Sequence, residues 1–155
     1  MTTEIGPLHV RRSIWIDAKP ERVWEEFEDL EHMRAWFGTG HSLTTYEPRV
    51  GGTVEVDANG QHDDIEEPLV FRGNVLVFDP PRELSFEQDW LGHGWAVPAI
   101  ITIRLTEHDT GTLVELFHHG FERMSDTATA AENQRGFEDG WTSRQLEALR
   151  ARVEN

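Results

Sequence analysis

Hydrophobic and polar residues alternate over residues 8–16, where every second side chain from Val10 to Ile16 shares one face. This period of two is typical of a half-buried strand. Further runs of the same kind follow, separated by short segments that contain glycine, proline or asparagine. These runs cover residues 43–48, 52–57, 69–78, 83–90, 97–106 and 111–118. Because the connections are short, the pattern predicts consecutive antiparallel hairpins.

A helical period is found before and after the later strands. Pro20, a favourable first residue of a helix, precedes an apolar face that includes Val23 and Phe27, and residues 31–37 form a second short helical piece. Residues 127–153 are expected to form one long helix with a broad apolar stripe. The stripe consists of Phe137, Trp141, Leu146, Leu149 and Val153. The inner face of the predicted sheet is the surface large enough to receive it.

Two glycines, Gly136 and Gly140, lie inside the predicted terminal helix. Each costs roughly 1 kcal/mol relative to alanine in a helix interior, so a compensating role is expected. Close packing against the sheet or the first helices is one interpretation. The other is a bend that lets this half of the helix open as a gate to a pocket.

The pattern as a whole predicts one α+β domain over residues 1–155. A curved, seven-stranded antiparallel sheet surrounds the long C-terminal helix, and two short helices connect the first strand to the second. Neither an internal repeat nor a linker divides the chain.

Composition narrows the classes of partner. The chain has 29 acidic and 14 basic side chains and a formal net charge of -15, which opposes binding to nucleic acid or to an anionic membrane. Cysteine is absent, and the sequence has no signal peptide, no membrane-spanning apolar run and no phosphate-binding glycine motif. We therefore expect a cytoplasmic protein that needs no cofactor and has no nucleic-acid or membrane partner.

Short motifs along most of the chain resemble those of a known family. They comprise Ala18, Pro20, Val23, Trp24, Trp36 and Phe37, then Gly73-x-Val75-Leu76, Asp79-Pro80-Pro81-Arg82-x-Leu84, His118-x-Gly120-Phe121 and Gly140-Trp141. Their order and spacing are similar to those of the activator of heat-shock-protein ATPase homologue family, in a single-domain form. That family belongs to the START-related or SRPBCC superfamily, which has the helix-grip fold. The resemblance implies this fold and a ligand pocket, whereas functions vary widely across the superfamily.

A ligand pocket is expected between the terminal helix and the inward-facing positions of the strands. The candidates for its lining are Trp36, Phe71, Val75, Phe86, Trp90, Trp95, Ile101, Ile103, Val114, Leu116, His118, Phe137 and Trp141. Each of these residues also suits an ordinary core. Aromatic residues at a helix end and around a glycine loop favour a cavity, because the mouths of pockets are commonly aromatic.

His118 is expected to point inward from the last strand, whereas His119 points outward. An inward imidazole could hydrogen-bond a ligand or serve as a weak candidate for acid–base catalysis, and the alternative is a satisfied core histidine. Candidates for a second polar group are Gln88, Arg12, Glu87 and Asp89. A metal site of His93, His118 and His119 lacks any recognised ligand spacing, so no metal is expected.

Three functions are compatible with these observations. The leading hypothesis is a binding protein for a hydrophobic small molecule, which acts as a monomer or a homodimer. The first alternative is an enzyme similar to polyketide cyclases, dehydratases or hydrolases, which would use His118 and a converging carboxylate in the same cavity. The second alternative, implied by the resemblance, is a cochaperone-like protein-binding module.

Overall fold

The structure is a computed structural model, and it describes residues 3–38, 41–59, 69–92, 95, 97–123 and 127–155. Strands and helices follow one another as the alternation of patterns predicts. Their order is β1 (Val10–Ile16), α1 (Pro20–Trp24), η1 (Glu25–Phe27), α2 (Leu30–Arg34), β2 (Leu43–Tyr46), β3 (Thr53–Asp57), β4 (Val70–Asp79), β5 (Glu83–Trp90), β6 (Ala99–His108), β7 (Gly111–His119), η2 (Phe121–Arg123), α3 (Thr127–Gly140) and α4 (Arg144–Glu154). The seven strands match the seven predicted runs to within two residues at almost every boundary.

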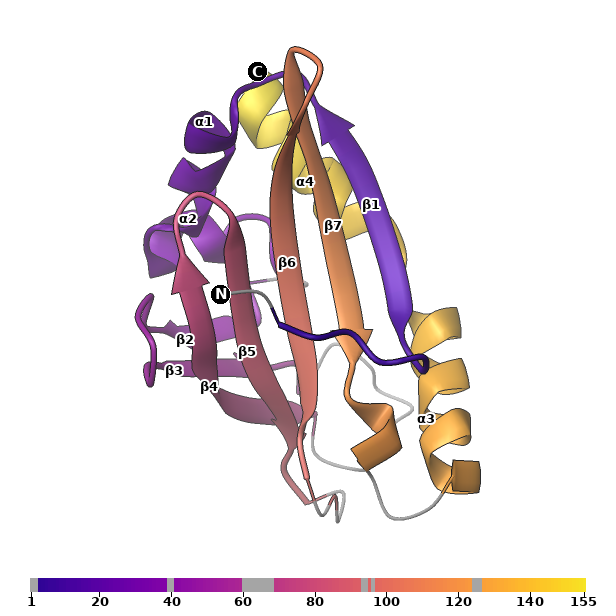
Figure 1. Cartoon of the computed structure of the whole chain (residues 1–155). Coiled ribbons are helices and arrows are strands. Elements are labelled where there is room, and N and C mark those ends of the chain that lie inside the picture. The colour runs from indigo at the N-terminus through magenta and orange to yellow at the C-terminus, as the bar shows by residue number, and fades with distance from the viewer. Residues whose placement is uncertain (1–2, 39–40, 60–68, 93–94, 96, 124–126) are drawn as a thin grey trace.

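All seven strands form one antiparallel sheet in the order β1-β7-β6-β5-β4-β3-β2. The chain meanders from β2 to β7, and β1 then pairs with β7, so that Val10 lies opposite His118. The sheet is strongly curved, because β2 and β3 run crosswise to β6 (Figure 1). This is the helix-grip architecture that the sequence predicts.

One face of the sheet, called the inner face below, is covered by helices. Figure 1 shows α4 lying behind β6, β7 and β1. From α4, Leu146, Leu149 and Val153 are buried in the same apolar cluster as the inward residues of the strands. Such burial stabilises the fold by about 25 cal/mol for each Å² of apolar surface removed from water. The core therefore lies between this helix and the sheet.

The short helices after β1 close one end of the core with aromatic rings. Trp24 stacks on Phe27 with 4.9 Å between ring centroids, and Phe27 packs against Trp36 at 5.1 Å. The indole of Trp36 donates a hydrogen bond to the carbonyl oxygen of Glu26, and the hydroxyl of Tyr46 donates to that of Phe27. These bonds satisfy carbonyl groups where the helices are too short to do so themselves.

The C-terminal part of the chain forms two helices, whereas the sequence predicts one. α3 ends at Gly140, and α4 begins at Arg144 after a short irregular segment. Arg12 of β1 donates to the carbonyl oxygens of Glu138, at 2.7 Å, and Trp141, at 3.0 Å. A cation at this position satisfies unpaired carbonyl groups and opposes the helix dipole, so it stabilises the end of α3. An added Cβ at Gly136 would meet no atom within 4 Å, so close packing does not explain that glycine.

The other face of the sheet, called the outer face, is crossed by the N-terminal segment in front of β5, β6 and β7 (Figure 1). Thr3 donates through its backbone N–H and its hydroxyl to Glu83, each at 2.9 Å. Arg104 donates to the other oxygen of Glu83 at 2.8 Å, and Thr102 bonds His119 Nε2 at 2.8 Å. His119 thus points outward as predicted, yet it is only 2% exposed.

Candidate functional site

A pocket of about 290 Å³ lies between the inner face of the sheet and the junction of α3 and α4. The sheet supplies Val56, Ala58, Phe71, Gln88, Trp90 and Ile101. The helical side supplies Phe37, Gly38, Ser42, Phe137, Trp141 and Gln145. A volume of this size lies at the lower end of the range for small-molecule sites.

The walls of this inner pocket are mainly aromatic. Phe71 and Trp90, which are paired across β4 and β5, meet edge to face with 5.2 Å between centroids. Trp90, Phe137 and Trp141 are half-buried, in contrast to the fully buried rings of the core. Rings that stay accessible around a hollow can still bury apolar surface against a ligand.

Polar groups in the inner pocket are few and uncharged. Among the described residues that line it, none carries an ionisable side chain. Gln145 accepts a hydrogen bond from the backbone N–H of Gly38 at 3.1 Å. Gln88 is 2% exposed, and its Oε1 has no hydrogen-bond partner in the described part of the chain.

A second hollow of about 480 Å³, whose wall also includes Glu132 and Asn133, adjoins the first. The two share Trp90 and Phe137, and the second adds Leu69 and Trp95. Trp95 contacts Phe137 edge to face, with 6.1 Å between centroids. Trp90 and Phe137 thus separate the inner pocket from a more open vestibule, which reaches the surface beside α3.

His118 lies beneath the pocket and is fully buried. Its Nδ1 accepts a hydrogen bond from the indole N–H of Trp141 at 2.8 Å, and the rings of Phe121 and Phe137 pack against it at 4.9 and 4.3 Å. Burial, with a smaller contribution from nearby His119, lowers the pKa of His118 to about 3. The imidazole is therefore neutral at pH 7, and it fixes Trp141 in the pocket wall.

The candidate residues from the sequence fall into three groups in the structure. Phe71, Trp90, Ile101, Phe137 and Trp141 line the inner pocket, and Trp95 lines the vestibule. His118 supports the wall from below. The others, Trp36, Val75, Phe86, Ile103, Val114 and Leu116, lie in the buried core and do not line the pocket. Inward orientation therefore does not distinguish the lining from the core.

Several lining residues were not among those candidates. Val56 could have been found from its inward position in the strand pattern. Ser42 and Ala58 lie just outside the periodic runs, and Gln145 is a polar residue within the predicted terminal helix, so no apolar pattern in the sequence identifies them. Gln88 was considered only as a partner for a catalytic histidine, because a sequence does not reveal which buried amide lacks a hydrogen bond.

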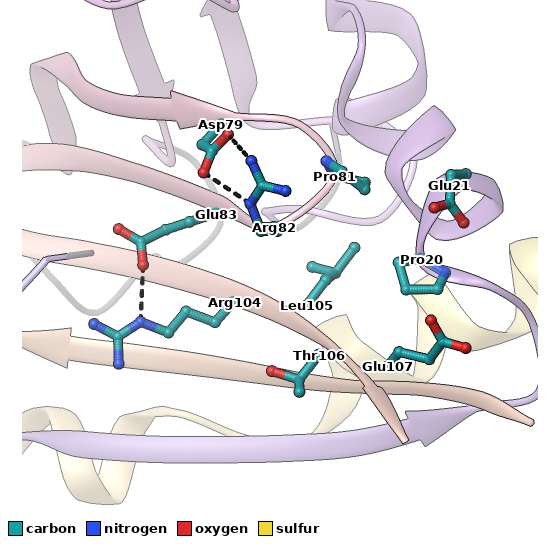
Figure 2. Close-up of a pocket in the computed structure, with 10 residues that line it drawn as sticks. All are labelled: Pro20, Glu21, Asp79, Pro81, Arg82, Glu83, Arg104, Leu105, Thr106 and Glu107. Carbon is teal, nitrogen blue, oxygen red and sulfur yellow. Dashed lines mark hydrogen bonds and ion pairs between the residues drawn. The ribbon is translucent and has the colours of Figure 1, made fainter. Parts of the chain in front are cut away.

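A larger pocket, of about 520 Å³, lies on the outer face between the β4–β5 turn and α1 (Figure 2). Charged side chains dominate its wall, and both of its arginines are already paired. Arg82 binds Asp79 at 2.8 Å, and Arg104 binds Glu83 at 2.8 Å, as the dashed lines show. Because these charges neutralise each other, we favour the inner pocket as the functional site despite its smaller volume.

The Arg12 contact leads to a prediction about how α3 is held. Replacing Arg12 with methionine keeps the apolar stem but leaves carbonyl groups of Glu138 and Trp141 without their donor. We expect a loss of about 1 to 3 kcal/mol in the free energy of unfolding. Thermal unfolding measures the loss, and limited proteolysis should show faster cleavage between α3 and α4.

The matched control for that variant is the neighbouring substitution Arg11→Met. Arg11 forms a largely exposed pair with Glu115 at 2.9 Å. Removal of such a pair changes stability by about 0 to 1 kcal/mol. Equal effects of the two substitutions would contradict the assigned role of Arg12.

Other classes of site were also considered in the structure. Within the described ranges, no group of three or more histidine, aspartate or glutamate side chains is arranged to hold a metal ion, and His93 lies outside these ranges. None of the helices of the described chain combines the length and apolar character needed to cross a bilayer.

Comparisons with known proteins agree with the fold. A family model for "Activator of Hsp90 ATPase homolog 1-like protein" matches residues 17–154. Protein MLL2253 from Mesorhizobium loti has a similar structure, with a TM-score of 0.71 and 20% identity over 94% of this chain and 96% of its own. None of the curated proteins matches this sequence.

Two further solved structures are similar to this chain. DynU16, a putative protein in the dynemicin biosynthetic locus, gives a TM-score of 0.65 at 20% identity, over 97% of this chain and 48% of its own. The Aha1 dimer from Colwellia psychrerythraea gives 0.56 at 15% identity, over 89% of this chain and 96% of its own. At these identities the likeness extends to the fold alone.

Proposed function

We propose that this chain, which belongs to the family of Activator of Hsp90 ATPase homolog 1-like proteins, binds a small apolar molecule in its inner pocket. The observation that carries the proposal is the ring of half-buried aromatic side chains around an uncharged hollow. A folded protein gains by packing such rings fully against each other. Where they instead stay half-buried, as Trp90 and Phe137 do, a ligand can bury their remaining surface.

Binding is favoured over catalysis by the surroundings of His118. An acid–base mechanism needs a histidine that reaches the reacting group and is assisted by a second polar group. Aromatic rings enclose His118, and its Nδ1 accepts a hydrogen bond from Trp141, whereas its buried Nε2 has no hydrogen-bond partner among the described residues. Glutamate and aspartate are absent from the described lining of the pocket. The arrangement supports a role for His118 in holding the wall.

The test uses N-phenyl-1-naphthylamine, an uncharged aromatic probe whose fluorescence rises in an apolar site. We expect saturable binding with one probe per chain, together with energy transfer from the tryptophans of the pocket. In the variant Ala58→Phe the new ring occupies the hollow, so the affinity should fall by at least about tenfold. The control Leu76→Phe makes the opposite face of β4 more aromatic, since Leu76 is 40% exposed, and it should bind normally.

An absence of saturable binding by the wild-type chain would contradict the proposal. Equal binding by wild type and Ala58→Phe would place the probe elsewhere. Thermal unfolding of both variants shows whether the fold is retained.

A further inference from the structure

We propose that the inner pocket selects an uncharged aromatic alcohol, whose hydroxyl group pairs with Gln88 while its flat ring system lies between the aromatic walls. This inference rests on the proposed function. It adds the chemical class of the ligand and the residue that recognises it.

The ligand is uncharged because the described lining of the pocket offers no charge to pair with it. A carboxylate or an ammonium group would lose its hydration on entry without gaining a counter-ion, which is strongly unfavourable. The chain also has a formal net charge of -15, which further disfavours anions.

We infer a hydroxyl group on the ligand because the side-chain amide of Gln88 has an unpaired oxygen. This side chain lies on β5 between Phe86 and Trp90 on the inner face, and its position is opposite Ala99 of β6. Its Oε1 is buried and has no hydrogen-bond partner among the described residues, which is costly unless a ligand supplies one. An amide both donates and accepts, and a hydroxyl group can satisfy either role.

Two other polar side chains of the pocket, Gln145 and Ser42, are already engaged. Gln145 accepts from the backbone of Gly38, and Ser42 also interacts within the protein. These residues therefore have less to gain from a ligand than Gln88 does. This difference makes Gln88 the residue expected to distinguish one apolar ligand from another.

We infer a flat ring system in the ligand because aromatic side chains form much of the pocket wall. Phe37, Phe71, Trp90, Phe137 and Trp141 all border the hollow. Aromatic side chains favour offset-stacked and edge-to-face contacts, which a planar ligand can make with several of them at once. A volume of about 290 Å³ suits a molecule of modest size, and a longer substituent could extend past Trp90 into the vestibule.

The experiment compares three probes of nearly equal size by displacement of N-phenyl-1-naphthylamine: 2-naphthol, 2-methylnaphthalene and 2-naphthoate. 2-Naphthol should bind about tenfold or more tightly than 2-methylnaphthalene, in which a methyl group replaces the hydroxyl. The anionic 2-naphthoate should bind more weakly than either of the others.

Two substitutions assign the preference to a residue. Gln88→Met removes the amide at nearly constant volume, so 2-naphthol and 2-methylnaphthalene should bind with similar affinity. Gln145→Met removes the amide that is already bonded, and the preference for 2-naphthol should persist. Because Gln88→Met also removes a buried unpaired group, its melting temperature should equal or exceed that of the wild type, which excludes misfolding as a cause.

The outcomes separate this inference from the proposed function. If all three probes bind equally, or if Gln88→Met keeps the preference for 2-naphthol, the pocket binds apolar molecules and the role of Gln88 is wrong. Tighter binding of 2-naphthoate overturns the requirement for an uncharged ligand. If neither the probes nor N-phenyl-1-naphthylamine binds, the proposed function itself is wrong.

Discussion

Acidification below about pH 6.5 is expected to lower the free energy of unfolding by roughly 1.4 kcal/mol per pH unit for His118 alone. Burial lowers the pKa of this imidazole to about 3, so it stays neutral in the folded chain. In the unfolded chain the same group takes up a proton near pH 6.5. The stabilisation is therefore complete above pH 6.5, and it is lost as the pH falls toward 3.

Two other histidines affect the same measurement. Burial, assisted by the positive charges of Arg104 and Arg123, lowers the pKa of His119 to about 4, so His119 adds to the loss with the same sign. A hydrogen bond to Asp29 raises the pKa of the exposed His32. Protonation of His32 therefore stabilises the folded chain, and its contribution to the pH dependence of the unfolding free energy has the opposite sign. Its exposure keeps that contribution small.

Urea unfolding at about pH 7, 6 and 5 measures the slope of the unfolding free energy against pH. The variant His118→Asn shows how much of that slope comes from His118. The amide oxygen of asparagine can take the place of Nδ1 as acceptor for Trp141, but it does not titrate. The slope should then fall by roughly 1.4 kcal/mol per pH unit. His108→Asn, which alters a histidine whose side chain is 63% exposed, is the control for the substitution itself. A wild-type stability that is constant from pH 7 to 5 would refute the neutral, buried state of His118.

The second large effect is expected on the outer face, where Arg104→Met should cost about 3 kcal/mol of unfolding free energy. Glu83 is 3% exposed, and the substitution leaves its carboxylate buried without the cation that faces it. The same change removes the donor to the carbonyl of Thr3 and a cation–π contact with Phe117. Denaturant unfolding measures the loss.

Two further variants test this explanation. Arg82→Met removes the other arginine that lines the larger pocket on the outer face (Figure 2), which is largely exposed and pairs with the half-buried Asp79, and it should cost less than about 1 kcal/mol. Adding Glu83→Gln to Arg104→Met removes the unpaired charge and should restore much of the loss. If the double variant is no more stable than Arg104→Met alone, loss of the ion pair is not the cause.

The strands could be predicted from the sequence because the alternation and the turn residues act locally. The break between α3 and α4 could not, since the apolar stripe continues across it from Trp141 to Leu146. The contact that stabilises the end of α3 comes from Arg12, on a strand more than a hundred residues earlier. The burial of His119 was likewise not predictable, because its position in the strand pattern indicates an outward side chain.

The location of the pocket was predictable, whereas its lining was not. The expected region, between Phe137 and Trp141 on one side and Trp90 and Ile101 on the other, is where the inner pocket lies. Yet Phe86 and Ile103 share the same inward pattern and are core residues. Which positions stay accessible depends on where α3 rests, and that is set by tertiary contacts such as the bond between Trp141 and His118.

The C-terminal region forms two helices, and each helix contributes mainly to a different part of the structure. α4 contributes Leu146, Leu149 and Val153 to the main buried core, while α3 contributes Phe137 to the pocket and vestibule and Ala130 to a smaller buried cluster. Substitutions at the pocket-facing positions of α3 can therefore change the shape of the inner pocket with little effect on the core residues of α4. This arrangement makes α3 the natural segment to randomise when the domain is engineered as a sensor for new compounds.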